Sequence, residues 1–507
     1  MRRVLLAFVM LAPGCTLGPD FSSMVPDLPS GWTSRSVAAT SARSQPVPEP
    51  VDPQWWSVFG DPELTSLASR VAHDNLDVRV SALRLAESRA QRGVAASALF
   101  PAVNANASYT REQTSEKGAT SLFSSGASGS SVSTQSNGLG GRQGGIPSTG
   151  ASKITEPFDI FQYGADASWE LDLWGRVRRS IESADAAVTN SADTQRDVLV
   201  SMIAELARDY VNLRGVQDSL RITRENLVTA RETAQLTRVR SQGGLTTDLD
   251  VASADAQVAQ TESELPPLEQ QEAALINAIA FLLGEPPGSL AELRTAQPPP
   301  LAPVSVPVGL PSELARRRPD IRQADARLHG ATADIGTAEA DFYPRVTLSG
   351  SFAFQALQLR DLGDFASRTY GFGPSVSVPI FDGGRLRNTL ELRKLQQKEA
   401  AVTFQRTVLQ AWREIDDAMQ SYDSEQRRSE RIAAQVANSR RALGLARSRY
   451  TQGLSDYLEV LTAQRNLLTA QSSLANSHAT TNANLVSLYR ALGGGWEQAL
   501  PEEVAAR

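Results

Sequence analysis

The chain has 507 residues, of which 21% are charged and 41% are hydrophobic, and its formal net charge is −6. The sequence contains no basic stripe or basic tail, which argues against a nucleic-acid binder. His73, His329 and His478 are scattered, and the sequence carries no metal-ligand cluster, Gly-x-Ser-x-Gly motif or phosphate loop. These features argue against an enzyme.

Residues 1–14 have the pattern of a signal peptide. Arg2 and Arg3 form a basic start, residues 4–12 are apolar, and Cys15, the only cysteine, stands where the leader ends. This pattern predicts a covalent lipid on Cys15, which then becomes the mature N-terminus. The alternative is an ordinary leader with a chance cysteine. Thr16, in the place where an aspartate would favour retention in the inner membrane, points to the outer membrane.

The rest of the chain contains two copies of one pattern. Asp77 and Asp320 begin similar motifs 243 positions apart (320 − 77), and Gly175 and Gly384 do so 209 positions apart (384 − 175). Each copy reads as helix, two strands, two helices, so the sequence predicts a duplicated unit. The predicted domains are a signal peptide at 1–14, a lipidated extended strap at 15–62, a first repeat at 63–285, a Pro-rich linker at 286–311, a second repeat at 312–493 and a C-terminal tail at 494–507.

Each copy contains two segments in which apolar and polar residues alternate. The segments cover about 102–111 and 163–173 in the first copy and about 345–355 and 371–381 in the second. This length and period are typical of membrane β-barrel strands. The carboxylates Asp166, Glu170 and Asp172 share the polar face, as a water-filled barrel lumen would allow. A soluble sheet with one wet face is the alternative.

Long helical patterns follow the strands. A first helix is expected from Asp61 to about Leu99, with Asp61 as its N-cap. Residues 176–241 then carry a heptad of apolar residues and predict a helix of about 100 Å at 1.5 Å per residue. A turn at Gly243-Gly244, matched by Gly453, leads into a return helix that ends near Gly284. The first helix and the return helix are expected to stack end to end along the long one, and linker 286–311 is expected to stay outside the packed core.

Several motifs resemble the TolC-like outer-membrane factors, in particular the NodT-type efflux lipoproteins. The similarity extends over essentially the whole mature chain. The motifs are Trp55-Trp56-Ser57-Val58-Phe59-Gly60, Arg317-Arg318-Pro319-Asp320-Ile321-Arg322, Leu171-Asp172-Leu173-Trp174-Gly175-Arg176 and Pro379-Ile380-Phe381-Asp382-Gly383-Gly384-Arg385.

The resemblance implies a mixed α and β membrane protein. In this family a trimer forms a twelve-stranded β-barrel that continues into a long periplasmic α-helical barrel. Four strands cannot close around a channel, so some oligomer is required in any case.

The resemblance also implies a gate at the helix turns farthest from the strands. It assigns the gate tyrosine to Tyr450 and gate acids to Asp250 and Glu459, while Asp456 is a candidate replacement for a missing charge. Ser455 and Thr462 stand where other members carry locking residues, so the contacts that replace them are left open.

The acids have a second interpretation as helix caps. We prefer the cap for Asp248 and the gate for Asp250 and Glu459. A ring of acids at a narrow mouth favours cations.

The expected function is a passive exit duct for small molecules. It would be a homotrimer in the outer membrane that works with a periplasmic adaptor protein and an inner-membrane pump of the RND type, with no cofactor other than the lipid on Cys15. The alternatives are a duct for type I protein secretion and an envelope lipoprotein without a pore.

Overall fold

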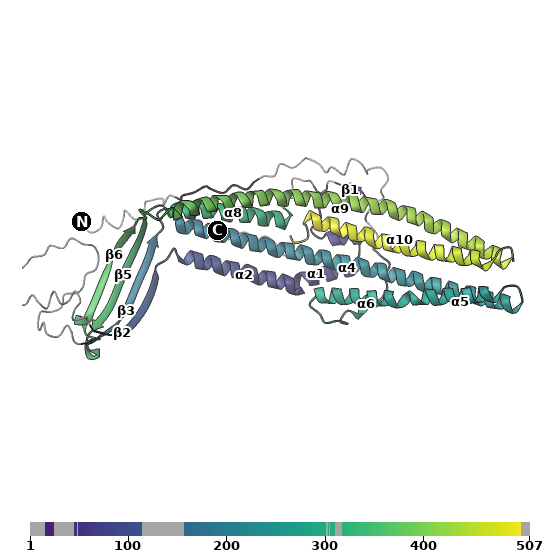
Figure 1. The fold of residues 1–507 in the computed structure, drawn as a ribbon, viewed down its shortest axis with the longest axis horizontal. Coiled ribbons are helices and arrows are strands. Elements are labelled where there is room, and N and C mark those ends of the chain that lie inside the picture. Colours follow the sequence, from purple (N-terminus) through teal and green to yellow (C-terminus); the bar gives the residue numbers. More distant parts are fainter. Residues whose placement is uncertain are drawn as a thin grey trace, which may run out of the picture. The chain divides into compact units, whose positions relative to one another are not determined.

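The computed structural model describes residues 16–24, 45–47, 49–113, 157–300, 303, 305–309 and 317–497. The chain divides into two compact units. One contains Met1–Gly18, Gly93–Ile181 and Gly336–Leu390, and the other contains Pro19–Arg92, Glu182–Ile335 and Glu391–Arg507. The first unit is built around a sheet and the second is helical (Figure 1).

The sheet of the first unit has four antiparallel strands, β2 (Ala102–Glu112), β3 (Phe158–Leu171), β5 (Arg345–Ala356) and β6 (Arg368–Ser377), in the order β2-β3-β5-β6. All four strands were expected from the alternation of apolar and polar residues. β3 begins five residues earlier than predicted and β6 ends four residues earlier, because alternation does not mark where hydrogen bonding to a neighbour stops.

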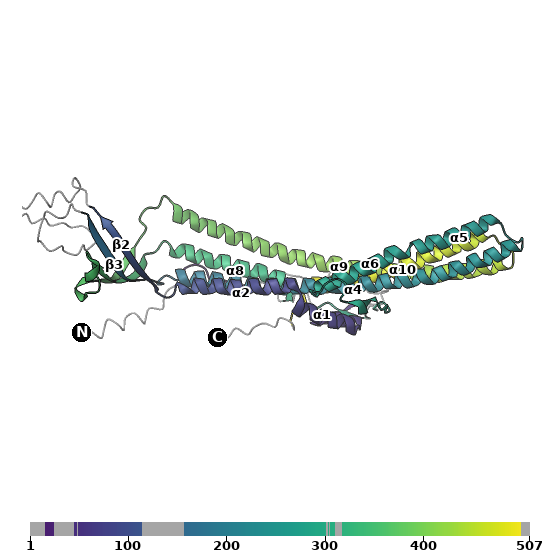
Figure 2. The ribbon, with the colours of Figure 1, turned by 90° about the horizontal axis from the view of Figure 1, so that it is seen from below.

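The helical unit contains two long hairpins, which Figure 2 shows from a second direction. Their two turns lie at the same end of the unit (Figure 1). The α-helices of the described residues are α1 (Pro62–Asp74), α2 (Leu76–Ser97), α4 (Arg176–Gln242), α5 (Asp248–Ser263), α6 (Leu265–Leu282), α8 (Pro319–Ala340), α9 (Arg385–Thr451) and α10 (Tyr457–Leu492). None of those in the described residues is long and apolar enough to cross a membrane.

The predicted heptad forms the core of the helical unit. Its α4 members are all buried: Leu199, Leu206, Leu213, Leu220, Leu227 and Ala234. On α9, Ile415, Tyr422 and Tyr450 follow the matching line and are also buried. The α9 line is interrupted at Ser429, which is half-buried. The buried lines show that these parts of the two 67-residue helices are held by packing along one face rather than by intrinsic propensity.

Two of the predicted helices are broken. Asp61 caps α1 as expected, accepting hydrogen bonds from the backbone of Glu63 and Leu64. The helix then ends at Asn75, whose side chain accepts from the backbone N–H of Asp77 and Val78 and so begins α2. The return helix is divided at Glu264 into α5 and α6, because the two prolines that follow supply no N–H donors.

The end-to-end stacking of short helices is confirmed at matching positions of both copies. The Asn75 side-chain amide donates to the Leu282 carbonyl at 2.8 Å, at the end of α6. Arg318 stands 243 positions after Asn75 (318 − 75) and donates to the Ala491 carbonyl at 2.7 Å, 209 positions after Leu282 (491 − 282). Each copy therefore joins its return helix to a short helix by a side chain that satisfies an open last-turn carbonyl.

The prediction that linker 286–311 lies outside the core was wrong. Leu290 and Leu293, in and beside the 3₁₀ turn Ala291–Arg294, are buried, as are Val306 and Val308. Strand β4 (Ser305–Pro307) pairs with β1 (Gln45–Val47) in a parallel two-stranded sheet. The strap is also packed, because Trp55 in the turn Trp55–Phe59 is buried against Tyr489. Proline content marked these segments as irregular but gave no information about burial.

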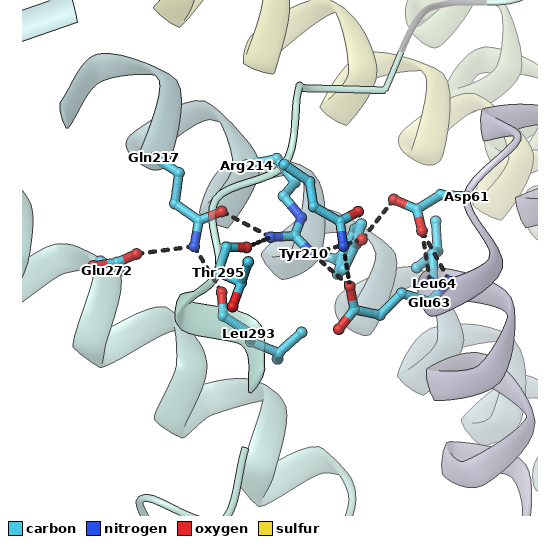
Figure 3. A network of polar contacts seen from close by, with 10 residues as sticks. Asp61, Glu63, Leu64, Tyr210, Arg214, Gln217, Glu272, Leu293 and Thr295 are labelled. Carbon is cyan, nitrogen blue, oxygen red and sulfur yellow. Dashed lines mark hydrogen bonds and ion pairs between the residues drawn. The ribbon is translucent and has the colours of Figure 1, made fainter. Parts of the chain in front are cut away.

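A buried polar network ties the first helix to the long one (Figure 3). Arg214 of α4 is fully buried and donates to Glu63 at 2.7 Å, to the Tyr210 hydroxyl at 3.0 Å and to the Thr295 carbonyl at 3.0 Å. Tyr210 in turn donates to Asp61. Burial and the Asp61 carboxylate raise the pKa of Tyr210, so its hydroxyl remains a neutral donor. The network joins α1, α4 and the segment after α6 in the middle of the unit.

Replacing Arg214 by methionine leaves Glu63 without its cation and the Thr295 carbonyl without a donor. Removal of one partner of a buried pair costs about 3 kcal/mol. We expect Arg214→Met to lower the thermal midpoint of the purified protein in detergent clearly, while Arg221→Met on the same helix, whose side chain is 54% exposed, changes it little. Equal midpoints for both variants would contradict this account.

Candidate functional site

The register of the sheet places the predicted apolar residues of all four strands on one side and their polar residues on the other. Ala105, Ala165, Phe352 and Tyr370 form one cross-strand row of the apolar face. On the same face Tyr163 stacks on Phe354 with ring centroids 5.2 Å apart. The sheet thus has one aromatic and aliphatic face and one polar face, as a strand that separates lipid from water requires.

The three carboxylates of the polar face do not form a uniform row. Asp166 lies mid-strand and accepts from the side chains of Asn104 and Asn106. Glu170 lies near the strand end and forms a two-bond ion pair with Arg176 at 2.7 and 2.8 Å. Asp172 lies beyond the end of β3.

Asp172 is instead a cap of the long helix. Its carboxylate accepts from the backbone N–H groups of Val177 and Arg178 in the first turn of α4. The expected lumen assignment for Asp166, Glu170 and Asp172 stays a prediction, and the geometry shows that two of the three also fasten the strand to the helix.

Residues 16–18 are seated at the same strand–helix junction. The Leu17 N–H donates to the Trp174 carbonyl at 3.2 Å, and Arg179 donates to the Leu17 and Gly18 carbonyls. A Cβ atom at Gly336 would lie 2.6 Å from the Leu17 carbonyl oxygen, so this site needs glycine. Cys15 itself lies outside the described residues.

At the tip of the first hairpin Asp250 is part of a capping box. Thr247 is the N-cap of α5; its hydroxyl accepts from the Asp250 N–H, and its own N–H donates to the Asp250 carboxylate at 3.1 Å. Partial burial raises the pKa of Asp250, but hydrogen bonds from Thr246 and Thr247 outweigh it and lower the pKa overall. The preference for Asp248 as the cap was wrong, because Asp248 is the first helical residue.

Tyr450, the predicted gate tyrosine, is buried between the two hairpins. Its hydroxyl donates to Thr237 of α4 at 3.4 Å, and its ring packs edge-on against Tyr457 with centroids 5.9 Å apart. Burial and the neighbouring Tyr450 raise the pKa of Tyr457 to about 12, so this ring stays neutral. The carboxylate of Asp250 is occupied by Thr246 and Thr247.

The acids of the second hairpin border an open groove. Arg449, Asp456, Glu459 and Thr462 contribute to the lining of a hollow of about 630 Å³ between α9 and α10. Glu459 faces Arg449 at 3.6 Å with both side chains at least half exposed, and Asp456 is the N-cap residue of α10 without a side-chain capping bond. Their carboxylates are therefore available at the surface of a single subunit.

None of the sequence motifs contains Arg240. This residue lies in the last turn of α4 and contacts the end of α9 in the other hairpin. The internal repeat could have pointed to Arg240, because Arg449 lies 209 positions after it (449 − 240) and the same offset relates the two turns.

A two-faced sheet together with paired long hairpins defines a channel-forming protein of the outer membrane with a periplasmic extension. Comparison with known proteins agrees. The family model "Outer membrane efflux protein" matches residues 67–285 and 310–494.

Two relatives and one solved structure illustrate the similarity. The pyoverdine export outer membrane protein OpmQ of Pseudomonas aeruginosa is 31% identical over 88% of each chain. The toluene efflux pump outer membrane protein TtgC of Pseudomonas putida is 30% identical over 98% of this chain and 96% of the relative. The structure of the outer-membrane channel OprN covers 95% of this chain and all of that chain, with 32% identity and a TM-score of 0.79.

The chain belongs to the outer membrane efflux protein family, and its fold is that of the TolC-like channels. The resemblance of the motifs to the TolC-like outer-membrane factors is confirmed, as are the outer-membrane location and the efflux function. The assignment to the NodT-type lipoproteins stays a prediction.

The capping box predicts different roles for two neighbouring acids. Asp250→Ala removes the carboxylate that holds Thr247 and is expected to weaken the first turn of α5 by about 1 kcal/mol, whereas Asp248→Ala is expected to have a smaller effect. Because the folded pKa of Asp250 is lowered, its contribution is present above the unfolded pKa and is lost as pH falls through the folded pKa. Hydrogen exchange of amides 246–251 measures it; equal protection in both variants would refute the assignment.

Proposed function

We propose that the protein is the passive exit duct of a tripartite efflux assembly, formed by three copies of this chain. A periplasmic adaptor and an inner-membrane pump of the RND type would supply energy and select most of the substrate. Family membership supports the efflux role, and the observation that carries the duct is the open sheet. The duct would have no enzymatic activity.

The sheet of one subunit has two open edges, one on β2 and one on β6, within the described residues. In lipid each unpaired backbone group costs several kcal/mol, so both edges require a partner. The four strands alternate in direction, and β6 of one subunit can therefore pair antiparallel with β2 of the next. Such a head-to-tail contact closes into a ring when the rotation between neighbouring subunits divides a full turn evenly, and we propose that it closes with three copies. Three copies supply twelve strands (3 × 4), the number that the family resemblance implies.

The helices support the same assembly with exposed apolar stripes. Leu76, Val80 and Leu83 of α2 lie at helical spacing, and Leu395, Val402 and Leu409 of α9 lie seven residues apart. Their side chains are between 45% and 68% exposed in a single subunit. A heptad stripe that the described residues leave exposed suits packing against a neighbouring subunit.

The tip acids would line the mouth of the duct. Three copies of Asp250, Asp456 and Glu459 at a narrow opening would concentrate negative potential and favour cations, with Tyr450 behind them as part of the gate. Asp250 can serve as both cap and gate residue, since a capping carboxylate retains further acceptor sites.

The Cys15 thiol is proposed to carry lipid. The leader pattern supports it, and the seating of residues 16–18 beside Trp174 fixes the chain right after Cys15 at the end of β3. Labelled palmitate should be incorporated into the protein but not into a Cys15→Ser variant. Equal labelling of both proteins would contradict the proposal that Cys15 carries the lipid.

Relatives favour small molecules over proteins as cargo. OpmQ is named for pyoverdine export and TtgC for toluene efflux. Two unlike small molecules handled by relatives of similar identity fit a passive duct whose substrate is chosen elsewhere. This favours the efflux duct over a type I protein-secretion duct.

Planar-bilayer conductance of the purified mature protein tests the duct, with the oligomeric mass measured on the same detergent sample. We expect discrete, cation-preferring current steps from a trimer. A monomer that gives no steps, even with Asp250 and Glu459 replaced by alanine, would support an envelope lipoprotein without a pore.

A further inference from the structure

Arg240 connects the tips of the two hairpins within one subunit. Its Nη1 donates to the backbone carbonyls of Tyr450 at 2.8 Å and Thr451 at 3.2 Å, the last two residues of α9. Its guanidinium carbon lies 4.6 Å from the centroid of the Tyr450 ring. One side chain from the end of α4 thus donates hydrogen bonds to the backbone and stacks on the aromatic ring at the end of α9.

The chemistry of this contact suits arginine. The last carbonyls of a helix lack intrahelical donors, and the helix dipole makes that end partly negative. A planar guanidinium can donate to these carbonyls while it stacks on an aromatic face, which the ammonium group of lysine cannot reproduce. Arg240 is half-buried and Tyr450 is buried, so water screens this contact less than a surface pair.

Two charged neighbours that could link the hairpins are engaged elsewhere, and the Tyr450 hydroxyl reaches Thr237 of the first hairpin only by a long hydrogen bond of 3.4 Å. The Asp250 carboxylate accepts from Thr246 and Thr247 on its own hairpin. Arg449, the repeat counterpart of Arg240, pairs with Glu459 on its own hairpin. The two copies therefore use the equivalent arginine differently, and the one in the first copy reaches across.

Contacts farther from the tip hold the same two hairpins together. Arg447 donates to the Thr229 carbonyl and the Thr233 hydroxyl of α4, and Arg465 of α10 donates to Gln257 of α5 at 2.7 Å. With these contacts in place behind it, loss of the Arg240 contact would release the turn region without separating the hairpins.

We propose that Arg240 is the positioning residue that latches the second hairpin turn to the first within each subunit and so favours the closed tip. This proposal rests on the gated duct proposed above. A ring of hairpins can widen when one hairpin moves against the other, and a contact made only in the closed arrangement shifts the population toward it. Ser455 and Thr462 stand where other family members carry locking residues. The Arg240 contact would take over the role of those missing residues.

The test compares Arg240→Met with Arg238→Met in planar bilayers. Arg238 lies two residues away on α4 and pairs with Asp255, with both side chains nearly half exposed, so it matches Arg240 in helix position and charge. We expect Arg240→Met to raise the mean current per channel several-fold, Arg240→Lys to give an intermediate value, and Arg238→Met to behave like the unaltered protein.

A second pair of variants keeps the test valid if Arg240→Met folds poorly. Tyr450→Phe keeps the ring and should conduct like the unaltered protein, whereas Tyr450→Leu removes the stacking face and should open the channel. In an Arg240→Met background, Tyr450→Leu should then raise the mean current per channel little further, because both changes break the same contact.

The outcomes separate the latch from the duct. If the unaltered trimer conducts and Arg240→Met leaves the mean current per channel unchanged, the latch alone is overturned. Arg240 would then be a structural helix cap, whether or not its replacement lowers the thermal midpoint. Silence of every variant would overturn the duct and the latch together. A silent unaltered protein with a conducting Arg240→Met variant would support both.

Discussion

The structure depends on the rule that backbone polar groups in lipid must be hydrogen bonded. The alternating faces of β2, β3, β5 and β6 fit a lipid boundary, yet a four-stranded sheet leaves one row of N–H and C=O groups open on each outer strand. Neither edge can be satisfied by the described residues of the same chain. The proposed assembly of several copies would pair both edges, and the exposed apolar stripes on α2 and α9 suit the same assembly in the helical unit.

The duplicated pattern meets a second constraint, which is the length of the helical unit. A 67-residue helix such as α4 needs an equally long partner. The first copy provides one by joining α5, α6 and α2, and the second copy by joining α10 and α8. Asn75 and Arg318 make those joints at corresponding positions, although one is an amide and the other a guanidinium. The same duplication left room for divergence at the tips, where Arg240 crosses to the other hairpin and Arg449 does not.

The sequence predicted the features that repeat and missed those that depend on a single contact. Period-two alternation located four strands and the heptad of Leu199 to Ala234 located the core of α4, because many residues carry each signal. The break at Asn75, the burial of Leu290 and Val306, and the capping role of Asp250 depend on local partners that alternation and heptads do not encode. The Arg240 contact joins residues 210 positions apart, and only the fold brings them together.

Disulfide trapping across the outer strands tests the central claim most directly. Cys15 is the only native cysteine, so in a Cys15→Ser background a pair with one cysteine at Ala105 of β2 and the other moved along β6 (Arg368–Ser377) reports unambiguously. Within one subunit two strands separate β2 from β6, about 14 Å in all, too far for a disulfide. Pairs in register should give a ladder that ends at three linked chains. Products that stay at one chain, or that extend without limit, would contradict a closed ring of sheets.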